Sequence, residues 1–165
     1  WSTGTLHICN RDVLNDNTTN ASIADARISI LRNGNVGIGT TNPTYKLDVS
    51  GNIRCTSLYQ TSDKRLKNNI QNLNSVLDLI NGVNPVSFNI ETDNKTKYGF
   101  IAQELENIIP DIVNTPNDDD DYYCVDYVSM IPLLTKSTQE LHKIIIEQEN
   151  KISKLEEILA RNGIV

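Results

Sequence analysis

The sequence predicts an α+β fold with three zones, assembled as a homotrimer. These are an intertwined N-terminal β-stalk (residues 1–61), a small α/β body (62–130) and a C-terminal coiled-coil helix (131–165). Short runs of alternating apolar and polar residues predict the strands of the stalk. Mixed helical and strand patterns predict the body, and a heptad repeat predicts the final helix.

The composition favours a chain that borrows surface from other copies of itself. Of the 165 residues, 38% are hydrophobic and 5% aromatic, which leaves little material for a large core. The net charge of −6 argues against nucleic acid as a partner, since phosphate binding needs clustered Lys and Arg. No run of about 18 apolar residues is present, so no membrane span is expected.

Residues 1–61 carry three short alternating runs, at 26–31, 35–39 and 45–49. Turn signals separate them: Asn33-Gly34, Asn42-Pro43 and Ser50-Gly51. Each run is too short to form a stable sheet alone. The scarcity of bulky apolar residues favours an intertwined trimeric stalk, of the β-helix kind, over the alternative of a small monomeric β-sandwich. The abrupt start at Trp1, without a signal pattern, is expected of a fragment of a longer chain.

The body begins with an apolar spacing typical of a helix. Its members are Leu66, Ile70, Leu73, Leu77 and Ile80, and Asn81-Gly82 is expected to end the helix. Strands are predicted over 85–90 and 97–102. A second helical piece follows over 103–109, where Pro110 stops it.

The final zone has a coiled-coil seam, which we define as two series of core positions. Thr138, Ile145, Ile152 and Leu159 form one series, and Leu134, Leu141, Gln148 and Leu155 form the other. Isoleucine in the first series and leucine in the second favour a coiled coil of two helices, whereas Ile144 and Ile158 widen the apolar stripe and suit three helices. The pattern alone leaves the number of helices open. Gln148 adds a polar layer that can set register, and Asn162-Gly163 ends the helix.

No metal or cofactor is expected. Cys9, Cys55 and Cys124 are widely spaced, odd in number and outside any metal-ligand pattern, so isolated thiols are predicted. The acidic run 118–121 is interpreted as a solvated loop, because a calcium loop needs spaced oxygen ligands and a glycine turn.

The segment between stalk and body holds a serine and a lysine five residues apart, Ser62 and Lys67. A serine hydroxyl needs a base to become a nucleophile, and a lysine is such a base when burial lowers its pKa. On one helix the two side chains would lie roughly 140° apart and would not meet. They meet if Ser62 precedes a helix that Asp63 caps and Lys67 lies in its first turn. Taken alone, these residues favour an ordinary helix start with a solvated face.

Four blocks in a fixed order change the interpretation of this serine and lysine. They are Ser62-Asp63-x-Arg65-x-Lys67-x-x-Ile70, Tyr98-Gly99-Phe100-Ile101-Ala102-Gln103-Glu104-Leu105, Val125-Asp126-Tyr127 before Ile131-Pro132-Leu133-Leu134, and the coiled coil. With these blocks the chain resembles the intramolecular chaperone domain at the C-terminus of phage tail spikes such as endosialidases, also found in myelin regulatory factors. Upstream, residues 34–40 and 47–54 look like stalk segments of viral fibres.

The resemblance implies a self-cleaving serine endopeptidase that acts once, on its own chain. The domain is expected to trimerise, to template the folding of the upstream stalk as its client, and then to release itself. Ser62 would be the nucleophile and Lys67 the base, with Asp63 and Gln103 as candidate supporting groups. The resemblance points to the Ser62–Asp63 bond, whereas five-membered ring geometry favours Thr61–Ser62. The expected location is a virion, after assembly in the host cytoplasm.

Three alternatives stay open. The first is a non-cleaving trimerisation cap, and the second is a receptor-binding tip of a viral fibre. The third is a transcription factor of the regulatory-factor kind, which would need a DNA-binding domain upstream and a membrane span downstream.

Overall fold

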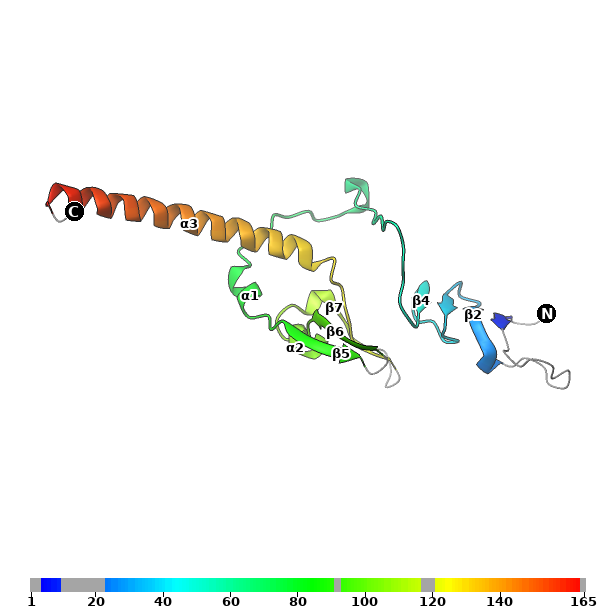
Figure 1. The fold of residues 1–165 in the computed structure, drawn as a ribbon. Coiled ribbons are helices and arrows are strands. Elements are labelled where there is room, and N and C mark those ends of the chain that lie inside the picture. Colours follow the sequence, from blue (N-terminus) through cyan, green and yellow to red (C-terminus); the bar gives the residue numbers. More distant parts are fainter. Residues whose placement is uncertain (1–3, 10–22, 91–92, 117–120, 164–165) are drawn as a thin grey trace. The chain divides into compact units, whose positions relative to one another are not determined.

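The computed structural model describes residues 4–9, 23–90, 93–116 and 121–163 (Figure 1). The fold is mixed α and β with a long C-terminal helix, as predicted. The chain divides into two compact units, Trp1–Leu66 and Lys67–Val165. In its described residues, the first unit has strands and short 3-10 turns as its regular elements. The second unit holds the final helix and the predicted body from Lys67 onwards, whereas residues 62–66 of the predicted body fall in the first unit. Most of the predicted acidic loop, residues 118–120, lies outside the described residues.

Four short strands form the sheet of the first unit: β1 (Leu6–Cys9), β2 (Ala26–Ile30), β3 (Val36–Ile38) and β4 (Leu47–Val49). They lie side by side in chain order, antiparallel from β1 to β3, and β4 pairs parallel to β3. The turn between β2 and β3 has Gly34 at φ +81°, a conformation that favours glycine. The three predicted runs therefore form strands, and β1 is an addition. This is one sheet, so the described residues give no sign of the sandwich alternative.

The interior of the first unit is made of small and polar groups. Ser29 is fully buried, where its hydroxyl lies 2.9 Å from Nδ1 of His7. Asn35 is buried too, and its amide donates to the carbonyl of Pro43 at 3.0 Å. A Cβ at Gly37 would lie 2.5 Å from the carbonyl oxygen of Thr40, so only glycine fits there. The large apolar side chains instead stay exposed, among them Leu6, Ile8, Ile38 and Leu47.

The second unit contains an apolar core, which we call the core cluster: Leu105, Ile109, Ile112 and Met130. The elements around it are α1 (Leu77–Asn81), the antiparallel pair β5 (Val86–Ile90) and β6 (Asp93–Gly99), α2 (Ala102–Glu106), a 3-10 turn (Pro110–Ile112), and the antiparallel pair β7 (Val113–Asn114) and β8 (Cys124–Val125). Partly buried residues from α1, β7, β8, the final helix and the connecting segments complete the packing. This unit therefore has the hydrophobic centre that the first unit lacks.

The helix predicted from Leu66 to Ile80 is wrong over most of its length. A 3-10 turn covers Lys64–Leu66, and α1 then covers only the last turn before Asn81-Gly82. Asn69 adopts φ 51°, a left-handed conformation that an α-helix does not allow. The segment is rich in asparagine, a weak helix former, and Leu66, Ile70 and Leu73 stay largely exposed.

Two of the sequence blocks meet at the end of β6. The amide of Phe100 donates to the hydroxyl of Tyr127 at 3.2 Å, and the two rings stack with centroids 5.7 Å apart. A Cβ at Gly99 would overlap that hydroxyl oxygen, so the glycine permits this approach. The contact explains why the strand ends at Gly99 rather than running to Ala102 as predicted.

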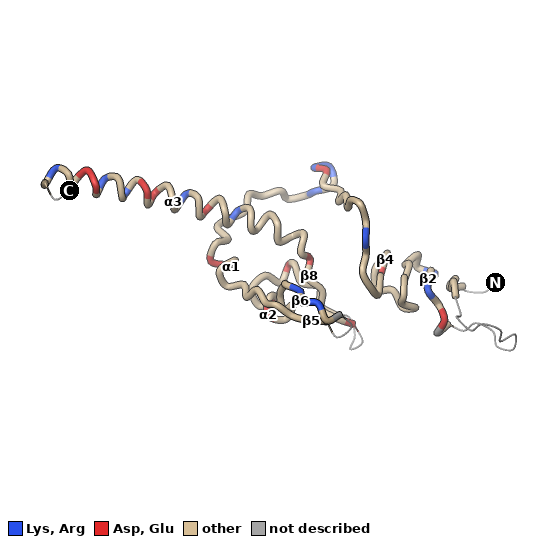
Figure 2. The backbone as a smooth tube through the Cα atoms, viewed as in Figure 1, with Lys and Arg blue, Asp and Glu red and all other residues tan. Residues whose placement is uncertain are grey.

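The final helix, α3 (Met130–Arg161), begins in the core cluster and then leaves the body (Figure 1). Every residue from Leu141 to Gly163 is exposed. Acidic and basic residues are interspersed along its length (Figure 2). It ends at Asn162-Gly163, with Gly163 at φ +64°, as predicted. The seam is therefore a long apolar stripe that nothing covers in the described part of this chain.

Candidate functional site

The predicted catalytic segment lies on the boundary between the units. Residues 51–62 have no regular secondary structure and are all exposed. Ser62 lies near the end of the first unit and Lys67 is the first residue of the second. Both side chains are exposed in the single chain. A lysine needs burial to become a neutral base, and this single chain does not bury the Lys67 side chain.

Asp63 binds the neighbouring Arg65 rather than standing free. Its carboxylate accepts the backbone amide of Arg65 at 2.8 Å and pairs with the Arg65 guanidinium at 2.7 Å. The Arg65 side chain, and then its backbone amide, hold the pKa of Asp63 below its ordinary value. Asp63 thus caps the 3-10 turn Lys64–Leu66, in the capping role that was predicted but on a shorter element.

Gln103, the other candidate supporting group, is exposed on α2. Its backbone carbonyl accepts the side-chain amide of Asn107 at 2.8 Å. Gln103 also lines an open pocket of about 300 Å³, and the other walls are aromatic or aliphatic: Phe100, Ile101, Ala102, Tyr122, Tyr123, Val125 and Tyr127.

A contact that the sequence did not predict joins α3 to the segment after Lys67, and we call it the Glu140 contact. One carboxylate oxygen of Glu140 accepts the Ser75 hydroxyl and the backbone amides of Val76 and Leu77, each at 3.1 Å. The other oxygen lies 3.7 Å from Nζ of Lys136. Burial alone would raise the pKa of Glu140, but these hydrogen bonds and the lysine charge outweigh it and hold the pKa below its ordinary value.

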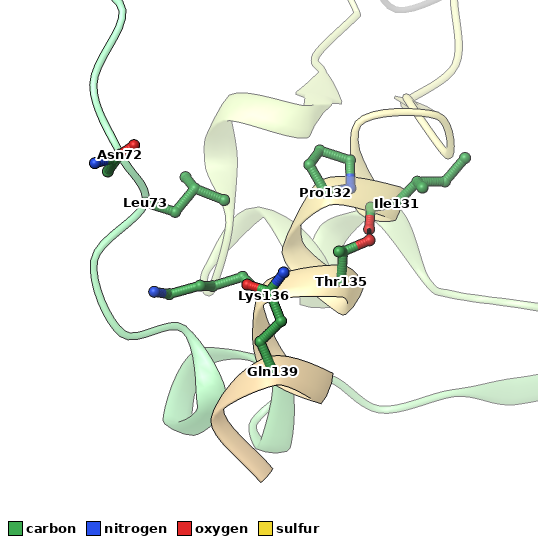
Figure 3. Close-up of a pocket in the computed structure, with 7 residues that line it drawn as sticks. All are labelled: Asn72, Leu73, Ile131, Pro132, Thr135, Lys136 and Gln139. Atoms are coloured by element: carbon green, nitrogen blue, oxygen red, sulfur yellow. Dashed lines mark hydrogen bonds between the residues drawn. The ribbon is translucent and has the colours of Figure 1, made fainter. Parts of the chain in front are cut away.

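Beside this contact is an open groove of about 640 Å³ (Figure 3). Asn72 and Leu73 approach from the segment after Lys67, and the first turns of α3 form the opposite wall. The residues on that wall are Ile131, Pro132, Thr135, Lys136 and Gln139. Ile131 continues the seam backwards by seven residues from Thr138, so the groove borders the seam.

Asp126 stabilises the turn that leads into α3. Its carboxylate accepts the hydroxyl of Ser129 at 2.6 Å and the backbone amides of Ser129 and Val128 at 3.1 and 3.0 Å. These bonds, that of the Ser129 hydroxyl above all, lower the pKa of Asp126. The block Val125-Asp126-Tyr127 therefore both stabilises the turn before the long helix and contacts the end of β6.

The described residues contain neither a metal-binding cluster nor a helix able to cross a membrane. No group of three or more His, Cys, Asp and Glu side chains there could hold a metal ion. Within the same residues, no helix combines the length and the apolar character that crossing a membrane requires.

Comparison with known families identifies the segment that starts at Ser62. Residues 62–114 match a peptidase family described as "Chaperone of endosialidase". This match confirms, for residues 62–114, the resemblance predicted from the sequence blocks. The family is one of self-cleaving peptidases, and the match supports a chaperone role in general.

Curated relatives come from Dictyostelium discoideum. The chain is 32% identical over 111 residues to a myelin gene regulatory factor-like protein A, covering 55% of this chain and 11% of the relative. It is 36% identical over 102 residues to an uncharacterized membrane protein, covering 51% of this chain and 6% of the relative. The chain thus spans only about a tenth or less of the length of these relatives.

Proposed function

We propose that this chain is a self-releasing intramolecular chaperone. Three copies associate through α3, the assembled second unit templates the folding of the upstream β-rich stalk, and the chain then breaks beside Ser62. The observation that carries the proposal is the family match, which begins at Ser62 itself.

The exposed seam supports association of copies. Large apolar side chains along the seam are between a third and two thirds exposed, for example Leu155 at 58%. Covering such a stripe with identical helices is the usual solution for a heptad repeat. Thr138 fits this arrangement because its hydroxyl already donates to the carbonyl of Leu134 at 2.9 Å, which leaves its methyl group for the seam. Ile144 and Ile158 beside the seam favour three strands over two.

The proposed chemistry uses Ser62 and Lys67. Association buries Lys67, which makes its amine neutral near pH 7 and able to accept the Ser62 proton. The Ser62 oxygen attacks the carbonyl carbon of Thr61, and the Thr61–Ser62 amide bond breaks as its nitrogen takes the proton back from Lys67. Water then hydrolyses the ester to a Thr61 carboxylate and the Ser62 hydroxyl. For cleavage at Ser62–Asp63 the attacking hydroxyl must come from another residue, because attack by the Ser62 hydroxyl on the Ser62 carbonyl carbon needs a four-membered ring.

Intact mass of the freshly made chain tests the cleavage. Wild type is expected to give two fragments, and a first fragment ending at Thr61 or at Ser62 identifies the bond. Ser62→Ala and Lys67→Ala should remain as one chain of 18.5 kDa. Ser57→Ala and Lys64→Ala are matched controls that should still cleave. Undiminished cleavage in Ser62→Ala would reject the mechanism.

A non-cleaving trimerisation cap is the second candidate function. It is favoured by the exposure of both Ser62 and Lys67 and by the pairing of Asp63 with Arg65. Intact mass separates this cap from the self-releasing chaperone, because a cap gives a single species of full mass. Light scattering should still show that species to be a trimer.

The parent of this domain is proposed to be a viral fibre or tail spike, located in the virion. The glycine-rich repeats before Ser62 support this assignment. The relative described as a myelin gene regulatory factor-like protein supports the alternative of a regulatory factor. The sequence upstream of Trp1 would distinguish a viral fibre from a regulatory factor, because a regulatory factor requires a DNA-binding domain there.

A further inference from the structure

We infer that Glu140 is a positioning residue for the cleavage, because it ties the segment that carries Lys67 to the helix that assembles the trimer. This inference rests on the proposed function and deepens it. Nothing in the family match points to Glu140, which lies beyond the matched residues 62–114.

In the Glu140 contact, one side chain of α3 holds the start of α1 by hydrogen bonds. The amides of Val76 and Leu77 stand at the start of α1, where a helix leaves its N–H groups without internal partners. No side chain of α1 itself caps them, and Glu140 supplies the missing acceptor from more than 60 residues away in the chain. The segment before α1 is therefore held against α3 by a charged acceptor.

A second feature, the groove, lies closer to Lys67. Leu73 faces the groove wall formed by the first turns of α3 (Figure 3). Lys67 precedes Asn72 by five residues, so its backbone stays within about 18 Å of the groove. The groove borders the seam through Ile131, which is 60% exposed.

The Glu140 contact and the neighbouring groove couple assembly to the cleavage site. When other copies cover the seam, they also approach the groove and the segment that Glu140 holds there. Because the Glu140 contact restrains the segment that carries Lys67, this lysine then enters the new interface at a restricted position. Without the Glu140 contact, the trimer still forms through the seam, but Lys67 is no longer held where the Ser62 proton must be taken.

The test compares two glutamates at equivalent heptad positions outside the seam. Glu140→Ala removes the contact, and Glu147→Ala, one heptad later and exposed, is the matched control. Glu140→Gln is the conservative variant, because an amide oxygen can still accept from Ser75, Val76 and Leu77. Three quantities are measured in the full chain: the mass by light scattering, the hydrogen exchange of the Val76 and Leu77 amides, and the cleavage rate.

The expected result separates positioning from assembly. All variants should form trimers. Glu140→Ala should show faster exchange at Val76 and Leu77 and cleavage slowed by about tenfold to a hundredfold. Glu140→Gln should keep its cleavage rate within about threefold of wild type, and Glu147→Ala should match wild type.

Each contrary result has a distinct meaning. Wild-type cleavage speed in Glu140→Ala overturns the inference while leaving the proposed function intact. So does a failure of Glu140→Ala to trimerise, because Glu140 would then serve assembly. Equal loss in Glu140→Gln and Glu140→Ala also contradicts the hydrogen-bonded Glu140 contact. If wild type itself does not cleave, the proposed function fails, and this inference fails with it.

Discussion

The two units of this chain bury different kinds of residue. The second unit packs Leu105, Ile109, Ile112 and Met130 into an apolar core, with Leu105 only 2% exposed. The first unit buries Ser29, Asn35 and Gly37 and leaves Leu47 57% exposed. Burial of apolar surface is the main source of stability, so the second unit has what it needs to fold and the first does not.

This difference fits a division of labour between template and client. A sheet of strands three to five residues long, without an apolar core, needs partners to become stable. The proposed trimer brings three such sheets together and can cover their exposed leucines and isoleucines. If the template is then cut away, the client keeps its fold through a high unfolding barrier, which is kinetic stability.

The largest expected effect comes from breaking the seam. Ile152→Asp places a charge at a seam position, where a charge cannot be covered without a large desolvation cost. We expect trimers to become monomers by light scattering, while the body keeps its fold. Asn150→Asp adds the same charge on the far side of the helix and should remain trimeric. A trimeric Ile152→Asp would show that α3 is not the assembly element.

The next effect tests the core of the second unit. Leu105→Ala should lower the free energy of unfolding by about 2–5 kcal/mol, because it leaves a cavity in the core cluster. Leu47→Ala, in the first unit, should change the unfolding of the second unit by less than about 0.5 kcal/mol. Urea unfolding at one fixed protein concentration measures both. Equal losses would contradict the contrast between the units.

A smaller effect tests the junction of the two sequence blocks. Gly99→Ala should cost about 1–3 kcal/mol, since its Cβ would overlap the Tyr127 hydroxyl. In a Tyr127→Phe background the same change should cost less, because the overlapping oxygen is gone. A double-mutant cycle by urea unfolding measures this coupling. Purely additive costs would mean that Gly99 is needed for another reason.

The smallest effect is a pH dependence at the start of α3. The pKa of Asp126 lies below its ordinary value of 3.8, so its stabilisation is complete above that value and is lost as the pH falls through the lowered pKa. Asp126→Asn should therefore melt below wild type at pH 7. The difference in Tm should shrink at pH 3 and below, and a constant difference would contradict this assignment.

Local patterns predicted the parts of the fold that depend on local periodicity. The alternating runs became β2, β3 and β4, and the heptads became α3 up to Asn162-Gly163. The apolar spacing from Leu66 to Ile80 misled, because the asparagines between those residues disfavour a helix and Asn69 turns the backbone left-handed. Strand β1 has its partner at the far side of residues 10–22, and no pattern in its own residues was strong enough to predict it.

The candidate site could be predicted only in part, because tertiary contacts leave no local sequence pattern. Ser62 and Lys67 become candidates only together with the blocks after them, and the family match begins at that serine. The Glu140 contact joins residues 63 to 65 positions apart, and such a tertiary contact leaves no local signal. In the proposed mechanism the base Lys67 is buried by other copies of the chain, and the periodicity of one chain carries no information on such contacts.

The central claim is that the assembled second unit gives the first unit its fold. Hydrogen exchange of the β2 and β3 amides tests it most directly, measured in Ser62→Ala, so that no cleavage intervenes, with and without Ile152→Asp. We predict that these amides are protected in the trimer and exchange quickly once the seam is broken, while amides around Leu105 stay protected in both. Equal protection of β2 and β3 in both proteins would contradict the claim.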